Sequence, residues 1–457
     1  MRRRFCHRGG MLLAALALAG CATYRAKPLA NRPNLVSSVA SLHRTIPAMT
    51  AKDPPVTLAP TQSFSIDQIG LLAILNDPDL AEQRGQLGLA KAALLSASIL
   101  PNPSLGLGFA ALISGPGSTP SYAASLSQDI TSLITYRARV AAARASLGSV
   151  NASLLWQEWQ VAQQARLLAL DIHGDNAEIR YLKRELSLLS TELAQVSQAT
   201  ALGNLDLTAE APLIAANAGA ETALASARLT RLKVWQQLDA LLGLEPSVRF
   251  AISRPELTPP PADLTKLLTT LPERRPDLVA LRLGYRTSEE QLRAAILAQF
   301  PPLALGPSGG TDTSNVLSVG PTLTMELPIF NRNQGGIASA KATREVLHAQ
   351  YQAALDHADG MVHGLSTRIA VLAADLVQAR DAAATARRLS RNAENAYAQG
   401  NLDQRALVDY QTTALKRELD VIAYQTRLDT DQLALGIELG VGLPRTRLVN
   451  HTGVTHS

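Results

Sequence analysis

Two stretches without proline, residues 131–200 and 334–399, constrain the fold of this 457-residue chain more than any other feature. Both favour helix throughout, and because a helix rises about 1.5 Å per residue, each would extend roughly 100 Å. A helix several times the usual length does not fit inside a compact domain. Four glycines in the interior of these stretches weaken helix propensity and mark where we expect bends: Gly148, Gly174, Gly360 and Gly364.

The chain repeats one plan, and the second copy follows the first at an offset of about 198 residues. Three pairs of landmarks keep this offset in order: Asp77-Pro78-Asp79-Leu80 with Arg275-Pro276-Asp277-Leu278, Pro101 with Pro301, and Gly203-Asn204-Leu205-Asp206 with Gly400-Asn401-Leu402-Asp403. Chance similarity would not hold one offset through successive landmarks. The repeat therefore predicts two equivalent halves.

Each half is expected to hold an opening helix, two strands, a long helix and a shorter return helix, so the fold class is mainly α with a small β part. The opening helices, at 67–100 and 276–299, end at prolines. The first half, residues 64–250, has strands at about 103–114 and 121–130, its long helix at 131–200 and its return helix at 206–243. The second half, residues 263–445, has strands at about 302–311 and 315–329, its long helix at 334–399 and its return helix at 403–439. A proline-rich connector, residues 251–262, joins them.

Alternation of apolar and polar residues identifies the strands. It is clearest at 317–327, where Leu317, Val319 and Leu323 alternate with small or polar residues. One apolar and one polar face over roughly ten residues suit a membrane-crossing strand, although a half-buried soluble sheet has the same pattern. Four strands are too few to close a barrel, and lipid does not tolerate an open sheet edge, so a membrane sheet needs several copies of the chain. Three copies would supply twelve strands.

The N-terminus has the pattern of an export signal followed by a lipid attachment site. Residues 1–20 join a basic front to an apolar core too short to span a membrane. Leu18-Ala19-Gly20-Cys21 has the form of a bacterial lipobox, in which Cys21 carries the lipid, including palmitate; the alternative is an ordinary signal with an incidental cysteine. Ala22 stands where an inner-membrane retention signal would place aspartate, so we expect the outer membrane.

The mature chain has neither a disulfide pair nor the charge of a nucleic-acid-binding protein. Cys6 lies in the removed segment, so packing must stabilise the fold. Without the signal peptide, the chain contains 39 basic and 38 acidic residues. It has no basic stripe with interleaved aromatic residues. Residues 21–63 are proline-rich and predict an extended, lipidated linker, and residues 446–457 predict a disordered tail.

Three motifs carry a resemblance to a known family. Arg274-Arg275-Pro276-Asp277-Leu278, Leu327-Pro328-Ile329-Phe330-Asn331-Arg332-Asn333-Gln334-Gly335, and Tyr397-Ala398-Gln399-Gly400 through Asp409-Tyr410-Gln411 resemble the second repeat of the TolC family of outer membrane efflux proteins. The resemblance covers about residues 65–445. It implies a homotrimer with a twelve-stranded transmembrane β-barrel in the outer membrane and a tunnel of coiled helices across the periplasm. It also implies a periplasmic adaptor and an inner-membrane pump as partners.

The resemblance places a gate and a docking surface at the ends of the helical hairpins. Asp409 matches the second of two acidic positions at the family's entrance, while Ala406 occupies the first, so Asp403 and Asp206 are substitute gate candidates. Carboxylates that converge on one axis attract cations. Asp206 and Asp403 equally suit helix N-caps. The candidates for contact with the adaptor are Gly203, Asn204, Leu205, Gly400, Asn401 and Leu402.

Neither a catalytic motif nor a cofactor other than the lipid on Cys21 is indicated. No phosphate-binding loop, nucleophile elbow or zinc-protease helix occurs, so we expect a passive duct that is not an enzyme. Asp356, Asp359 and His363 share a helix face as metal-ligand candidates, but they lack a fourth ligand and a solvated face explains them equally.

The substrate class is indicated by one motif. Asn331-Arg332-Asn333-Gln334-Gly335 resembles ducts of cobalt-zinc-cadmium exporters, which favours divalent metal cations and heavy-metal resistance. The alternatives are a duct for drugs or organic solvents and, in a different class, a non-transporting periplasmic structural lipoprotein.

Overall fold

The computed structural model describes residues 24–46, 56–58, 63–117, 119–257 and 263–441. Residues 24–35 belong to a unit of their own and contain neither helix nor strand. All other described residues belong to a second unit that begins at Val36. The expected signal peptide, Cys21 and the tail at 446–457 lie outside the described residues.

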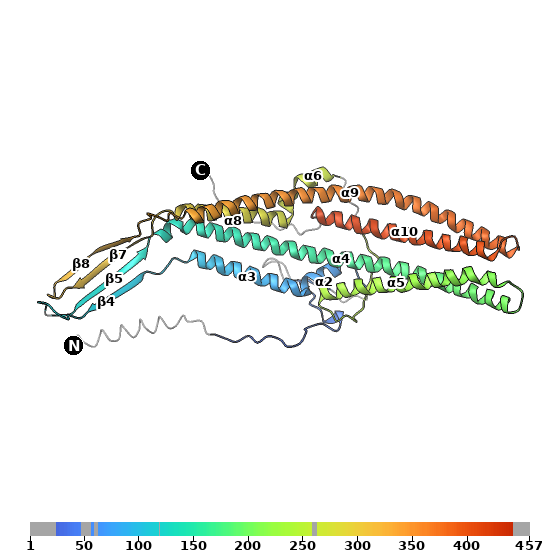
Figure 1. Cartoon of the computed structure of the whole chain (residues 1–457), viewed down its shortest axis with the longest axis horizontal. Helices are drawn as coiled ribbons and strands as arrows, with labels where there is room; N and C mark the ends of the chain where they lie inside the picture. The colour runs from blue at the N-terminus through green and yellow to red at the C-terminus, as the bar shows by residue number, and fades with distance from the viewer. Residues whose placement is uncertain (1–23, 47–55, 59–62, 118, 258–262, 442–457) are drawn as a thin grey trace. The chain divides into compact units, whose positions relative to one another are not determined.

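Helices make up most of the second unit (Figure 1). The first half contains α2 (Ile66–Asn76), α3 (Pro78–Ser98), α4 (Thr131–Ala201) and α5 (Glu210–Leu242). The second half contains α6 (Leu264–Thr269), α7 (Leu271–Arg274), α8 (Pro276–Leu297), α9 (Gln334–Ala398) and α10 (Gln404–Glu438). The two proline-free stretches form single continuous helices of 71 and 65 residues, α4 and α9. The predicted fold class, mainly α with a small β part, is confirmed.

The opening helix of the first half is broken in two, whereas the sequence predicts one helix over 67–100. Asp77 separates α2 from α3 with φ −58° and ψ 123°, because a residue that precedes proline is pushed out of the helical region. Its carboxylate accepts a hydrogen bond from the backbone N–H of Leu80 at 2.9 Å and so caps α3. Arg275 before Pro276 is likewise extended, which ends α7 and starts α8.

Two helical hairpins, α4 with α5 and α9 with α10, end in matching turns (Figure 1). Gly203 and Gly400 adopt the left-handed conformation, with φ of 76° and 73°. The N–H groups of Asn204 and Asn401 then reach back to helix carbonyl oxygens at 2.9 Å in both hairpins. These are Schellman caps, which glycine favours because it has no Cβ. The short 3-10 helix Leu207–Ala209 leads into α5.

The largest hydrophobic core lies where α2 packs on α4 and α5, and part of the expected linker belongs to it. Leu42 is 5% exposed within this core, and Val36 forms a bridge with Leu244. The expectation of an extended linker over 21–63 is therefore wrong for residues 36–46, because their apolar side chains cover the core. Within the predicted linker, two short strands, β1 (Thr45–Ile46) and β2 (Val56–Thr57), also pair with each other.

The connector between the halves also contributes to the fold. β6 (Ala251–Ile252), which falls in the predicted connector at 251–262, pairs in parallel with β3 (Ser63–Phe64). Phe250 contacts the rings of Phe64 and Trp235 edge-on, at 5.6 and 5.0 Å between centroids. The connector thus ties the first half to its own beginning.

The main sheet combines strands from both halves. Its order is β4 (Ser104–Ala110), β5 (Ser121–Asp129), β7 (Leu303–Thr311) and β8 (Leu317–Met325), all antiparallel. The central pair β5–β7, with Ser125 opposite Ser308, joins the two halves. β8 ends at Met325 rather than near 329, because its partner begins after Pro301 and Pro302, which have no N–H to donate.

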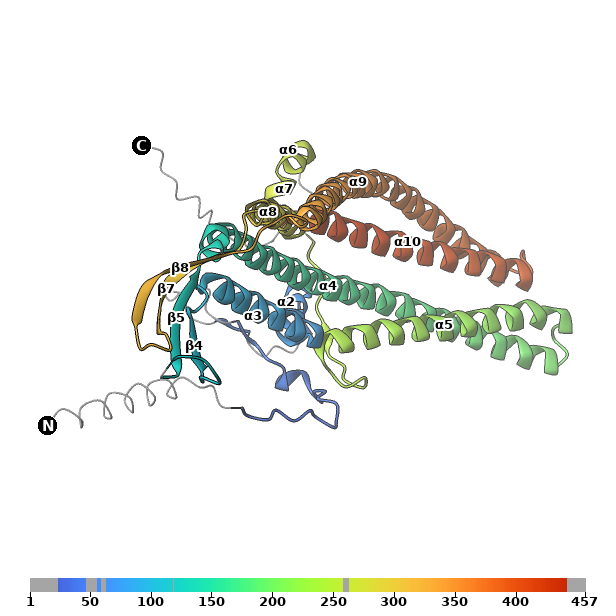
Figure 2. The ribbon, with the colours of Figure 1, turned by 60° about the vertical axis from the view of Figure 1, so that its left-hand side comes forward.

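The two glycines of α4 mark close helix contacts. A Cβ on Gly148 would lie 3.1 Å from the side chain of Leu283 in α8, and one on Gly174 would lie 2.7 Å from that of Thr426 in α10. Gly360 and Gly364 of α9 face open space, and Figure 2 shows α9 as a continuous curved ribbon. The glycines of α4 therefore allow neighbouring helices to approach.

Candidate functional site: a two-faced sheet and the hairpin tips

One face of the main sheet is apolar. Its register aligns Leu107, Ala124, Gly309 and Val319 in one row and Phe109, Tyr122, Thr311 and Leu317 in the next. Leu107 is 77% exposed and Val319 75%, and neighbouring apolar side chains are also exposed. An apolar surface of this extent needs lipid or another protein surface against it.

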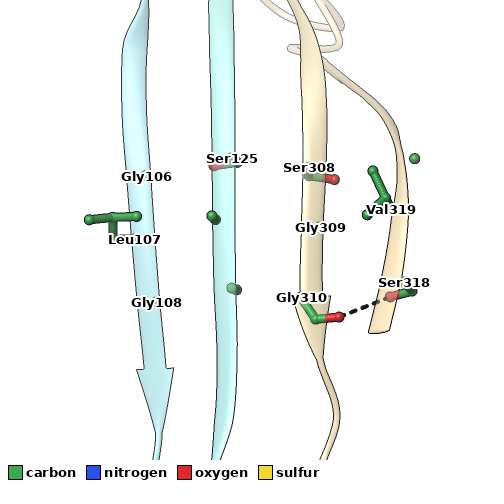
Figure 3. Close-up of a pocket in the computed structure, with 12 residues that line it drawn as sticks. Gly106, Leu107, Gly108, Ser125, Ser308, Gly309, Gly310, Ser318 and Val319 are labelled. Atoms are coloured by element: carbon green, nitrogen blue, oxygen red, sulfur yellow. Dashed lines mark hydrogen bonds between the residues drawn. The ribbon is translucent and has the colours of Figure 1, made fainter. Parts of the chain in front are cut away.

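The opposite face is lined by small, uncharged residues. The rows here are Gly106, Ser125, Ser308 and Gly320, then Gly108, Ala123, Gly310 and Ser318. They border a shallow hollow, in which the Ser318 hydroxyl donates to the Gly310 carbonyl oxygen at 3.4 Å (Figure 3). Because these residues are so short, the space in front of this face stays open. The face suits water rather than lipid.

Both outer edges of the sheet lack a partner strand in the described chain. β4 pairs with β5, and β8 pairs with β7, so the outward N–H and C=O groups of β4 and β8 face away from the sheet. In lipid an unsatisfied backbone group costs several kcal/mol. In lipid, this sheet would therefore need partner strands at both of its edges.

Two short junctions fix the sheet on the helices. The Thr131 hydroxyl donates to the Pro301 carbonyl oxygen at 3.1 Å and accepts from the Leu303 N–H at 2.8 Å. At the second junction Asn333 has φ 59°, and its side-chain amide donates to the Ala295 carbonyl oxygen at 2.8 Å. The motif at 327–335 is therefore a structural joint between β8 and α9.

The six predicted tip residues lie at the ends of the two hairpins, with Leu205 37% exposed. Asp206 and Asp403 act as N-caps, accepting hydrogen bonds from the N–H groups of Thr208 and Ala406 at 2.8 and 2.7 Å. The backbone hydrogen bond from Thr208 lowers the pKa of Asp206. The structure thus favours the capping alternative for both residues, while Asp409 lies exposed on α10.

The proposed metal ligands do not form a site. Asp359 lies 3.4 Å from Nδ1 of His363, but the carboxylate of Asp356 accepts from the Gln352 amide at 2.7 Å. Across the described ranges no cluster of three or more His, Cys, Asp or Glu side chains could hold a metal ion. Helical spacing places the three residues on a similar face without bringing their ligand atoms to one point.

A polar seam between the hairpins was not predicted from the sequence. Its signal is seven-residue spacing: Asp171, Glu178, Glu185 and Glu192 on α4, and Gln404, Gln411, Glu418, Gln425 and Gln432 on α10. The Gln411 amide donates to Glu192 at 2.8 Å across the two helices. Burial raises the pKa of Asp171, Glu185 and Glu192, and that of the neighbouring Asp175 to about 6.

Comparison with known proteins gives a family match and similar solved structures. The family model described as outer membrane efflux protein matches residues 267–441. No match was found among curated proteins. The crystal structure of a membrane protein from Pseudomonas aeruginosa has a TM-score of 0.72 and 18% identity, over 84% of this chain and 92% of that one. CusC, in crystal structures concerned with folding and transmembrane channel formation, has a TM-score of 0.70 and 16% identity, over 90% and 98%. The outer membrane protein VceC from Vibrio cholerae has a TM-score of 0.69 and 21% identity, over 83% and 97%.

The two-faced sheet, the long hairpins and these matches give the chain the fold of TolC-like outer membrane channels. The family match over residues 267–441 and the fold of the chain agree with the resemblance to TolC-like outer membrane efflux proteins that its motifs predict. The family match and the similar structures support an efflux duct. The prediction that the chain is not an enzyme is confirmed, because the members of this family are transport channels.

The assignment of the two faces predicts opposite effects for adjacent substitutions on β8. Val319→Lys places a charge on the apolar face, where a midplane lysine costs about 2–4 kcal/mol per chain, so we expect loss of protein from the outer membrane fraction. Ser318→Lys, on the small polar face, should leave the membrane-bound amount near that of the wild type. Immunoblots of fractionated membranes measure both, and equal loss in the two variants would contradict the assignment.

Proposed function

We propose that three copies of this chain form one outer-membrane efflux duct. The sheet is the main observation that supports this proposal. It has an exposed apolar face, a face of small residues and two open edges, as expected for one third of a closed barrel. Three four-stranded sheets supply twelve strands, within the range of known barrels. Small residues on the inner face leave the lumen of that barrel wide.

The helices supply a second reason for oligomerisation. α9 contains an 18-residue window with a mean hydropathy of 1.2, of which 17% is buried within one chain. By length and composition this window could also cross a membrane, but α9 is 65 residues long and packs beside α8 and α10. We assign the exposed apolar surface to contacts with α-helices of neighbouring copies.

In this proposal the duct is passive and works with a periplasmic adaptor and an inner-membrane pump. The adaptor contacts the hairpin tips at Gly203, Asn204 and Leu205 and at their counterparts Gly400, Asn401 and Leu402. Exposed apolar groups at the tips, Leu202 and Leu205 among them, support a protein partner there. Asp409, repeated three times around the axis, forms an acidic ring that favours cations.

Conductance tests the duct and its acidic ring together. Purified protein should run as a heat-resistant trimer and give single-channel currents in planar bilayers with cation preference. Asp409→Asn should reduce the ratio of cation to anion permeability, because it removes three charges from the entrance. Asp312→Asn, in the β7–β8 turn, is the matched control for loss of one charge per chain. An unchanged reversal potential in Asp409→Asn would show that Asp409 does not determine ion selectivity at the gate.

The lipid anchor is proposed on Cys21, supported by the lipobox and by Ala22 after it. Cys21→Ser should abolish incorporation of radiolabelled palmitate, because the thiol is the acceptor. The barrel strands are expected to keep part of the variant in the outer membrane, since acylation adds to rather than replaces their insertion. Label retained in Cys21→Ser would refute this site.

The proposed cargo is divalent metal cations. The motif Asn331-Arg332-Asn333-Gln334-Gly335 and the exposed Asp409 support it. A deletion strain should therefore lose tolerance to zinc and cobalt, and plasmid-borne wild type should restore it. A strain sensitised to drugs or organic solvents, but not to metals, would assign the duct to those compounds instead; the uncharged sheet face would admit them.

A further inference from the structure

Glu192 of α4 and Gln411 of α10 meet next to the hairpin tips with an incomplete hydrogen-bond pair. The Gln411 Nε2 donates to Glu192 Oε1 at 2.8 Å. The other oxygen of each side chain, Glu192 Oε2 and Gln411 Oε1, is buried without a hydrogen-bond partner in the described structure. Gln411 itself is 4% exposed.

The surroundings of the pair disfavour negative charge. Glu192 and Gln411 line a cavity between the two hairpins together with apolar side chains that include Val196 and Leu407. The titratable groups that face Glu192 in this cavity are Glu394 and Tyr397, both from α9. No basic side chain is among the residues that line it.

These surroundings raise the pKa of the Glu192 carboxyl. Burial is the largest cause, and the charge of Glu394 adds to it, while the hydrogen bond from Gln411 opposes both. An ionised carboxylate and an amide carbonyl both accept hydrogen bonds, so the two unpartnered oxygens cannot bond to each other. Buried acceptors left without donors are costly.

Binding of a proton from solvent to the Glu192 carboxylate would give both unpartnered oxygens a hydrogen-bond partner. Bound to Oε2, it turns that atom into a donor to Gln411 Oε1, while Gln411 Nε2 continues to donate to Glu192 Oε1. The carboxylic acid and the amide then form a closed pair with two hydrogen bonds, and every polar atom of the pair is satisfied.

We propose that Glu192 is a proton-binding site that clamps the two hairpins together beside the entrance of the duct. Because α4 and α10 belong to different hairpins, the closed pair restrains their separation. Protonation strengthens this contact, so acid favours the closed entrance and neutral pH loosens it. The regulation of conduction rests on the proposed function as a duct, whereas the acid–amide pair itself does not.

The sign of the pH dependence follows from the raised pKa. A carboxyl whose pKa lies above its ordinary value in the folded protein gains protons as the pH falls through that raised value. The clamp therefore forms on acidification and is lost as the pH rises.

Infrared difference spectra test the pair without any need for conduction. On acidification from about pH 7.5 to about pH 5, a range that spans raised carboxyl pKa values, the wild type should gain a hydrogen-bonded carboxylic-acid band. Glu192→Gln should lose the part of this band that Glu192 contributes, while the part from other carboxyl groups, such as Asp175 with a pKa of about 6, remains. Glu185→Gln is the matched control, because Glu185 lies seven residues away on α4 and also has a raised pKa. A wild-type spectrum in Glu192→Gln, or loss of the same band in Glu185→Gln alone, would overturn the assignment.

Conductance over the same pH change tests the clamp. Wild-type conductance should fall severalfold in acid. Glu192→Gln places an amide where the protonated acid would be, so its conductance should be low at both pH values. Gln411→Met removes the partner and should give high conductance at both. Wild-type pH dependence in both variants would refute the clamp, whereas a wild type that never conducts would refute the duct and leave the pair to the infrared result.

Discussion

The unpaired outer edges of β4 and β8 are the constraint on which the rest of the molecule depends. Backbone groups in lipid must find partners within protein, and one chain supplies four strands that do not close on themselves. The helices share this constraint, because α4 follows β5 directly and α9 is attached to β8 through the joint at 327–335. Whatever number of copies closes the sheet also sets the number of hairpins in the tunnel.

The helices pack more firmly within the first hairpin than between the two hairpins. Within the first hairpin, α4 and α5 hold together through fully buried apolar side chains such as Leu189 and Leu213. Between the hairpins, α4 and α10 meet partly through carboxyl and amide groups, such as the Glu192–Gln411 pair, two of whose oxygens have no hydrogen-bond partner among the described residues. Each hairpin is therefore a firm unit, and the boundary between hairpins is the place where relative movement costs least.

Sequence reasoning found the features that depend on local chemistry. The repeat, the two long helices and the glycine turns at Gly203 and Gly400 follow from proline, glycine and spacing alone. It missed the break at Asp77, although Pro78 is a sufficient signal for it. It also missed the packing of Leu42 into the core and the polar seam, because both depend on segments distant in sequence. The proline-rich composition around Leu42 predicted a linker rather than a segment of the core. The seven-residue spacing that includes Glu192 and Gln411 indicates a seam only when α4 and α10 are known to be neighbours.

The pairing of Ser125 with Ser308 at the centre of the sheet has a consequence for the order of assembly. The strands that hold this contact are separated by the whole first hairpin and the opening helices of the second half. Contacts between such distant segments form slowly, because the chain must bear the entropic cost of closing a long loop before the contacts stabilise it. The hairpins, with their local turns, can fold while the sheet is still open. The membrane-facing surface is thus completed late in folding, after the parts that stay in water have taken shape.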